Sequence, residues 1–177
     1  MRIIATLVLL VASASAFAGD FGPWAFGMSQ KQVLAHKEMG PFKSFSNGDL
    51  ETYSGVFGGK ARNFQFYFRD GHLWRVAIRI YEGKSIDDAG AACQETYIAL
   101  QERFGPIETP EMDGKTASEV CTQAKARVAA GNKGQMAPAI QPDGEFVFAT
   151  FARLDHNREP FYMVTVNLDP PPPAAKP

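Results

Sequence analysis

Alternating apolar and polar positions mark the most regular stretch of the chain. Two such segments are separated by Asp70-Gly71, and a period of two predicts an antiparallel hairpin with one apolar face. The apolar positions are Phe64, Phe66 and Phe68 in the first segment and Trp74, Val76, Ile78 and Ile80 in the second.

The loop length decides which residues pair across this hairpin. A two-residue loop, Asp70-Gly71, would pair Phe66 with Arg75 and put an arginine on the apolar face. A three-residue loop that starts at Arg69 pairs Phe66 with Trp74 and Phe64 with Val76. It also places Gly71 where a left-handed backbone carries no steric cost. We therefore expect the three-residue loop.

Helical spacing appears in three places. Ser85 is the expected N-cap of the longest helix, which ends at Gly105-Pro106. A capping box of Ser29 and Gln32 begins a short helix that ends near Lys37. A third helix is expected over Ser118–Ala130. The apolar stripe of the longest helix is Ile86, Ala89, Cys93, Tyr97, Leu100 and Phe104.

The other segments complete an α+β class, an antiparallel sheet with helices packed on one face. Thr52–Phe57 is a short strand that Gly58-Gly59 closes. A terminal strand pair is expected over Phe146–Leu154 and Phe161–Leu168, joined across Asp155–Pro160. Residues 131–144 are expected to be loop, and 170–177 a disordered proline-rich tail.

The first 18 residues have the pattern of a cleavable signal peptide. Arg2 supplies the positive charge, Ile3–Ala12 is apolar, and small residues follow. Cleavage fits after Ala16 or after Ala18, and we favour the second. The apolar run is too short to span a bilayer. We therefore expect a soluble periplasmic or secreted domain over 19–169, without stable membrane insertion.

Charge argues against nucleic acid as a partner. The chain holds 18 Lys and Arg against 19 Asp and Glu. Removing Arg2 with the signal peptide makes the balance slightly more acidic, so there is no basic excess to neutralise phosphates.

Cys93 and Cys121 are the two cysteines. In an oxidising compartment an even pair usually forms a disulfide, so we expect one here. Buried free thiols are the alternative. The spacing is not Cys-x-x-Cys, which gives a thiol-redox role little support.

Known chemical motifs do not occur in this chain. His36, His72 and His156 stand singly, without the spacing of metal ligands. Asp155-His156 would make an acid/base site only if it met His72, and solvated turn residues are the simpler interpretation. There is no nucleophile-elbow or phosphate-loop pattern. We therefore expect no catalytic residue, cofactor or metal.

The polar face of the hairpin is the remaining functional candidate. Arginine and tyrosine are enriched where interfaces carry binding energy, although an ordinary solvent-exposed face is the alternative. Tyr162 would extend this face if the last strands join the same sheet. The candidate residues are Gln65, Tyr67, Arg69, Leu73, Arg75, Arg79 and Tyr81.

Residues 24–81 resemble the SmpA/OmlA (BamE-like) family of bacterial envelope domains. The residues that carry the resemblance are Gly27-Met28-Ser29, Val33, Gly40-Pro41, Tyr53 and the Phe-rich strand that leads into Asp70-Gly71-His72-Leu73. The resemblance implies a helix with an antiparallel sheet, a design used twice in secreted β-lactamase inhibitor proteins. Members of the family mostly bind other proteins at the outer membrane, and there are no catalytic residues to carry over.

The chain departs from that family in two ways. It lacks the lipoprotein cysteine, and it has about 90 further residues. Residues 85–168 either form a degenerate second copy or extend one sheet, and we favour the simple extension. We expect a non-enzymatic periplasmic binding or accessory protein that contacts another envelope protein, with envelope assembly as the candidate process. A secreted enzyme inhibitor, and a small envelope hydrolase or ligand carrier, are the alternatives.

Overall fold

The computed structural model describes residues 22–112, 114, 116–156 and 159–172. The predicted signal peptide and both of its cleavage sites lie outside these residues. So does the proline-rich tail from residue 173 onward, while Pro170, Pro171 and Pro172 are exposed. None of the helices in the described part of the chain is both long and apolar enough to cross a membrane.

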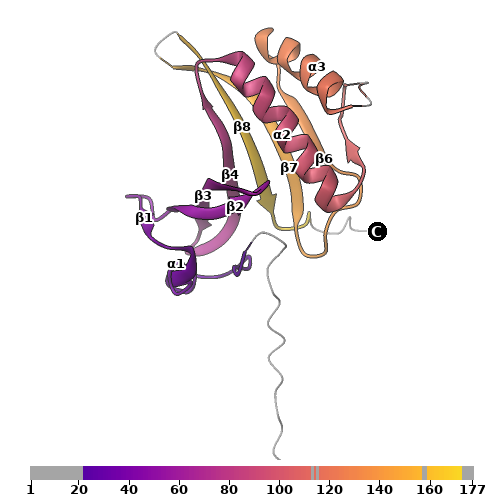
Figure 1. The fold of residues 1–177 in the computed structure, drawn as a ribbon. Helices are drawn as coiled ribbons and strands as arrows, with labels where there is room; N and C mark the ends of the chain where they lie inside the picture. Colours follow the sequence, from indigo (N-terminus) through magenta and orange to yellow (C-terminus); the bar gives the residue numbers. More distant parts are fainter. Residues whose placement is uncertain (1–21, 113, 115, 157–158, 173–177) are drawn as a thin grey trace, which may run out of the picture.

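Three α-helices and eight strands make up the described chain (Figure 1). The helices are α1 (Gln30–Leu34), α2 (Ile86–Phe104) and α3 (Ala117–Ala129), and a short 3-10 helix, η1 (Lys37–Met39), follows α1. The strands are β1 (Phe42–Ser44), β2 (Leu50–Phe57), β3 (Lys60–Arg69), β4 (His72–Gly83), β5 (Ile107–Glu108), β6 (Gly134–Pro138), β7 (Phe146–His156) and β8 (Glu159–Asp169).

All eight strands form one antiparallel sheet in the order β1-β2-β3-β4-β8-β7-β6-β5. This order consists of two four-stranded meanders, β1 to β4 and β5 to β8, which meet where β4 pairs with β8. The last strand along the chain is therefore a central strand of the sheet.

The two longer helices cover one face of this sheet. Helix α2 contacts β4 and β8, and α3 contacts β6 and β7 (Figure 1). The buried core lies on this face, where Val76 and Ile78 of β4 pair with Leu168 and Val166 of β8 at the centre. The predicted class, an antiparallel sheet with helices, is confirmed.

The predicted helix starts are confirmed at their caps. The Ser29 hydroxyl accepts a hydrogen bond from the Gln32 backbone in a capping box, and the Ser85 hydroxyl caps α2. Helix α1 ends at Leu34, before the predicted Lys37, and α3 begins one residue earlier than predicted.

The predicted hairpin register is wrong. The β3–β4 loop has two residues, Asp70 and Gly71, whose φ angles of 51° and 77° suit a tight hairpin turn. Phe68 pairs with Leu73 and Tyr67 with Arg75, so Trp74 is the extra residue of a β-bulge. The bulge moves the later residues by one position, which pairs Phe66 with Val76 and keeps Arg75 off the apolar face.

The second half contains one strand that was predicted as loop. Strand β6 lies within residues 131–144 and pairs with β7. Gly134 allows this because a Cβ there would lie 2.9 Å from the Ala124 Cβ of α3. The predicted pairing of the two terminal strands is confirmed, and both strands are longer than expected.

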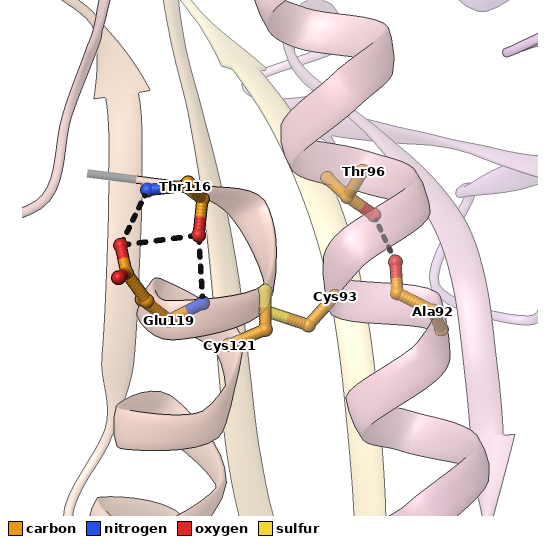
Figure 2. Close-up of a disulfide and its surroundings, with 6 residues drawn as sticks. All are labelled: Ala92, Cys93, Thr96, Thr116, Glu119 and Cys121. Atoms are coloured by element: carbon orange, nitrogen blue, oxygen red, sulfur yellow. Dashed lines mark hydrogen bonds between the residues drawn. A yellow bond between two sulfur atoms is a disulfide. The ribbon is translucent and has the colours of Figure 1, made fainter. Parts of the chain in front are cut away.

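A disulfide joins Cys93 of α2 to Cys121 of α3, as predicted (Figure 2). The Cα atoms are 5.8 Å apart and both residues are buried. Helix α3 begins at a capping box in which Thr116 and Glu119 bind each other's backbone, seen in the same view. The bridge fixes α3 against α2 above the second meander.

Candidate functional site

The candidate site is the sheet face opposite α2 and α3, which no helix of the described chain covers. We call it the uncovered face. Cross-strand partners share a face, so the register identifies its residues. One row runs through Gln65, Ala77, Asn167 and Phe148 in β3, β4, β8 and β7. Other members are Tyr67, Arg75, Arg79 and Thr165.

Four predicted residues meet on this face. The Tyr67 hydroxyl donates to Gln65 Oε1 at 2.6 Å, and Arg79 Nη2 donates to the same oxygen at 2.9 Å. Arg79 also forms an ion pair with Glu82. Arg75 lies beside Tyr67 as its cross-strand partner.

Arg75 is held in place on several sides. Its Nε and Nη2 each donate to the Asp169 carboxylate at 2.6 Å. Its guanidinium carbon lies 4.6 Å from the Trp74 ring centroid and 5.8 Å from that of Phe148. The hydrogen bond to Asp169 raises the pKa of the guanidinium further above its ordinary value, against the effect of burial. Arg75 is therefore a fixed positive charge between aromatic rings.

Arg69 and Trp74 extend this cluster. The Arg69 guanidinium carbon lies 4.3 Å from the Trp74 ring centroid. Trp74 was predicted in the core, but its bulge position leaves it half-buried under these two arginines. We call Arg69, Trp74, Arg75 and Phe148 the arginine–aromatic cluster.

Three residues do not belong to the uncovered face as predicted. Leu73 is 1% exposed and packs in the core, because the two-residue loop pairs it with Phe68. A second register shift after Arg79 turns Tyr81 toward the core, and its hydroxyl accepts a hydrogen bond from the Ser85 backbone. Tyr162 is 7% exposed in the same core and does not extend the face.

Two adjoining depressions hollow the first meander on this face. Their volumes are about 390 and 500 Å³, and they share Phe45 and Gln65. The buried Glu51 carboxylate lines the larger one, where Lys43 lies 3.1 Å away and Asn63 donates to it at 3.2 Å. Tyr53, which is 67% exposed, lines it too. The depressions add aromatic and polar contact area next to Tyr67.

Two polar atoms on the uncovered face lack a hydrogen-bond partner among the described residues. They are Arg79 Nε and Thr165 Oγ1, both buried, on residues that pair directly across β4 and β8. Buried polar atoms normally have a hydrogen-bond partner, so these two are exceptions among the described residues of this face. The sequence contains no pattern that predicts them, because they arise from strand pairing.

The histidines do not come together. His72 begins β4, whereas His156 ends β7 beside Glu159, which is the opposite end of the sheet. His36 follows α1, and its Nδ1 lies 3.2 Å from Glu38 Oε1. Within the described residues, no group of three or more His, Cys, Asp or Glu side chains is arranged to hold a metal ion.

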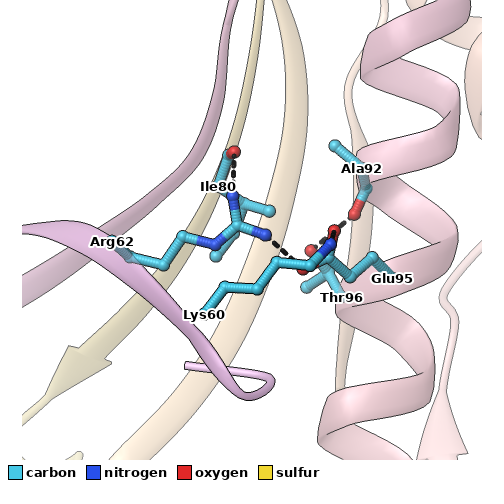
Figure 3. A network of polar contacts seen from close by, with 6 residues as sticks. All are labelled: Lys60, Arg62, Ile80, Ala92, Glu95 and Thr96. Carbon is cyan, nitrogen blue, oxygen red and sulfur yellow. Dashed lines mark hydrogen bonds and ion pairs between the residues drawn. The ribbon is translucent and has the colours of Figure 1, made fainter. Parts of the chain in front are cut away.

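A second polar cluster lies on the helix side of the sheet (Figure 3). Lys60 and Arg62 of β3 both form ion pairs with Glu95 of α2, and Arg62 also donates to the Ile80 carbonyl at 3.2 Å. Burial raises the pKa of Glu95, but the hydrogen bonds from Lys60 and Arg62 outweigh it and hold that pKa below its ordinary value. The cluster fastens the β2–β3 hairpin to α2, and sequence analysis missed it.

Comparison with protein-family models, with curated proteins and with solved structures found no significant match to this chain.

Proposed function

We propose that this chain is a non-enzymatic binding or accessory protein of the periplasm or the secreted fraction, which contacts another protein through the uncovered face. The arginine–aromatic cluster is the observation that carries the proposal. Arginine and aromatic residues dominate the binding energy of protein interfaces. Because Asp169 already holds Arg75, little side-chain entropy is lost when a partner binds it.

The proposed compartment rests on two separate features. The first 18 residues have the pattern of a signal peptide. The Cys93–Cys121 disulfide suits an oxidising environment such as the periplasm. Envelope assembly is the process that the SmpA/OmlA resemblance favours.

The two meanders support a relation between the halves of the chain. The first half has α1 before β1 to β4, and the second half has α2, β5 and α3 before β6 to β8. The two four-stranded meanders join edge to edge. We propose that residues 85–168 are a degenerate second copy of the unit over 24–81. This doubled design is the one that the resemblance associates with secreted β-lactamase inhibitor proteins, so inhibition of an enzyme is our second candidate function.

Site-specific photo-crosslinking tests the proposed face. A photoreactive phenylalanine analogue replaces Tyr67 on the uncovered face or, as the matched control, Ile98, which is 47% exposed on α2. We expect a crosslinked protein partner in cells from position 67 and none from position 98. A crosslink from position 98 alone, or from neither position, would contradict the proposal.

Charge reversal provides an independent test with the identified partner. Arg75→Glu/Arg79→Glu should weaken binding by at least about tenfold, because interface arginines commonly contribute more than 1 kcal/mol each. Lys31→Glu/Lys37→Glu makes the same change of charge at exposed positions near α1 and should leave binding unchanged. Thermal unfolding of all variants checks that they are folded, and equal affinities for the two double variants would reject the face.

A further inference from the structure

The second half of β7 is an open sheet edge. Strand β6 pairs with β7 only from Ala149 to Phe151, whereas β8 pairs with β7 along its whole length. From Ala152 to His156, therefore, no described strand pairs with the other side of β7. Leu154 is 47% exposed at the middle of this stretch. Unpaired backbone donors and acceptors on such an edge favour the addition of another strand.

The charges along this edge are self-complementary. Arg153 and Asp155 lie one residue before and one after Leu154, with opposite charges and on the same sheet face. We propose that a second copy of this chain pairs with the edge in antiparallel orientation, with Leu154 opposite Leu154. Arg153 of each copy then lies opposite Asp155 of the other. Opposite charges directly across a strand pair are stabilising, and like charges are destabilising.

Only this register places opposite charges across from each other. The two copies are related by a two-fold axis, which passes between the two Leu154 residues in this register. If the axis passed between the two Asp155 residues, two aspartates would lie opposite each other, and an axis between the two Arg153 residues would oppose two arginines. Registers between these would oppose residues from different faces of the sheet. The chosen register also uses all five residues of the unpaired stretch, which is itself centred on Leu154.

In the dimer, the ion pair between Arg153 and Asp155 of one copy is replaced by ion pairs between the copies, at little cost in free energy. Within one copy, Arg153 Nη2 lies 3.0 Å from Asp155 Oδ1, and these side chains are 34% and 65% exposed. An exposed ion pair of this kind contributes at most about 1 kcal/mol. Both side chains are therefore available to a neighbouring copy. Five residues bury little area, so the dimer should be weak and depend on concentration.

The symmetry has a geometric result. A two-fold axis between antiparallel edges runs perpendicular to the sheet, so the two sheets become continuous and both uncovered faces point to the same side. This inference does not depend on the proposed function, because it concerns the edge and not the face.

Sedimentation velocity over a range of concentrations tests the dimer. The purified protein should show a reversible monomer–dimer equilibrium. Arg153→Asp places two acidic residues opposite each other, and Asp155→Arg places two arginines opposite each other. Each single variant should weaken dimerisation by about tenfold or more. The double variant Arg153→Asp/Asp155→Arg restores opposite charges and should return to within about threefold of the original protein.

Arg103→Asp, an exposed change on α2, is the control and should leave the equilibrium unchanged. Far-UV circular dichroism of each variant establishes that it is folded. A protein that is monomeric at every concentration overturns the proposal. So does a dimer that the single variants leave intact, or one that the double variant does not restore.

Discussion

Leu73 and Trp74 are adjacent residues with opposite environments. Leu73 is 1% exposed, while Trp74 lies half-buried beneath Arg69 and Arg75. Their apolar character alone does not distinguish them, because both suit the core. The difference comes from the β-bulge. Leu73 pairs with Phe68 of β3, whereas Trp74 is the extra residue of the bulge and has no partner in β3.

Leu73→Ala should therefore lower the free energy of unfolding by about 3 kcal/mol, the usual cost of a cavity at a buried leucine. Leu34→Ala, at a leucine that is 39% exposed, is the matched control and should cost less than about 1 kcal/mol. Urea denaturation measures both. Similar losses would show that Leu73 is not in the core.

Glu95 links stability to pH. The pKa of Glu95 in the folded state lies below its ordinary value of 4.5. The contribution of Glu95 to the free energy of unfolding is therefore fully present above pH 4.5 and is lost as the pH falls through the folded-state pKa. Glu95→Gln should cost about 1 kcal/mol at pH 7, since its carboxylate is partly screened by solvent. The difference from the unchanged protein should disappear in strong acid.

Urea denaturation at several pH values measures this dependence. Glu102→Gln, at an exposed glutamate on the same helix, is the control and should show little change at any pH. A cost for Glu95→Gln that is the same at neutral and acidic pH would contradict the assignment of the pKa shift to its ion pairs with Lys60 and Arg62.

At the scale of elements, local signals in the sequence predicted the helices and the main strands. Ser29 and Ser85 cap the helices that they were expected to cap, and the apolar stripe that contains Cys93 faces the core. Strand β6 was missed because Gly134 and Pro138 are poor strand formers, and pairing with β7 provides the stability that its own sequence lacks.

The candidate site was predicted only in part for a related reason. Gln65, Tyr67, Arg75 and Arg79 follow the simple alternation of their strands and were placed on the correct face. Contacts between β4 and the later strands depend on long-range pairing, so the partners Asp169, Phe148 and Thr165 were not predicted. Bulges break the alternation that sequence analysis relies on.

The disulfide between α2 and α3 should raise the free energy of unfolding by about 3–4 kcal/mol, because it closes a loop of this length in the unfolded chain. Cys93→Ser/Cys121→Ser should have a lower Tm than the oxidised protein by several degrees or more. Calorimetry with and without reductant provides the control, because the double variant should not respond to reductant. An oxidised protein with the same Tm as the variant would contradict this contribution.

At the scale of the whole molecule, the junction of β4 with β8 joins the meanders through one core. Val76, Ile78, Val164 and Val166 are buried there, and the arginine–aromatic cluster crosses the same junction on the other side. The halves therefore depend on each other, although each has its own helices.

We expect both halves to unfold in one transition. Tryptophan fluorescence follows the first half, which contains Trp24 and Trp74, while far-UV circular dichroism follows mainly α2 and α3. The two signals should have the same midpoint in urea. Separate midpoints would show that the meanders unfold independently.

The central place of β8 also has a consequence for the order of events in biosynthesis. A ribosome makes residues 159–169 after every other strand of the sheet, yet β4 and β7 both need them as their partner. Until this segment appears, the nascent chain holds two unjoined halves with exposed apolar strands, the state that chaperones recognise. We therefore expect the complete sheet to form only after residues 159–169 have left the ribosome.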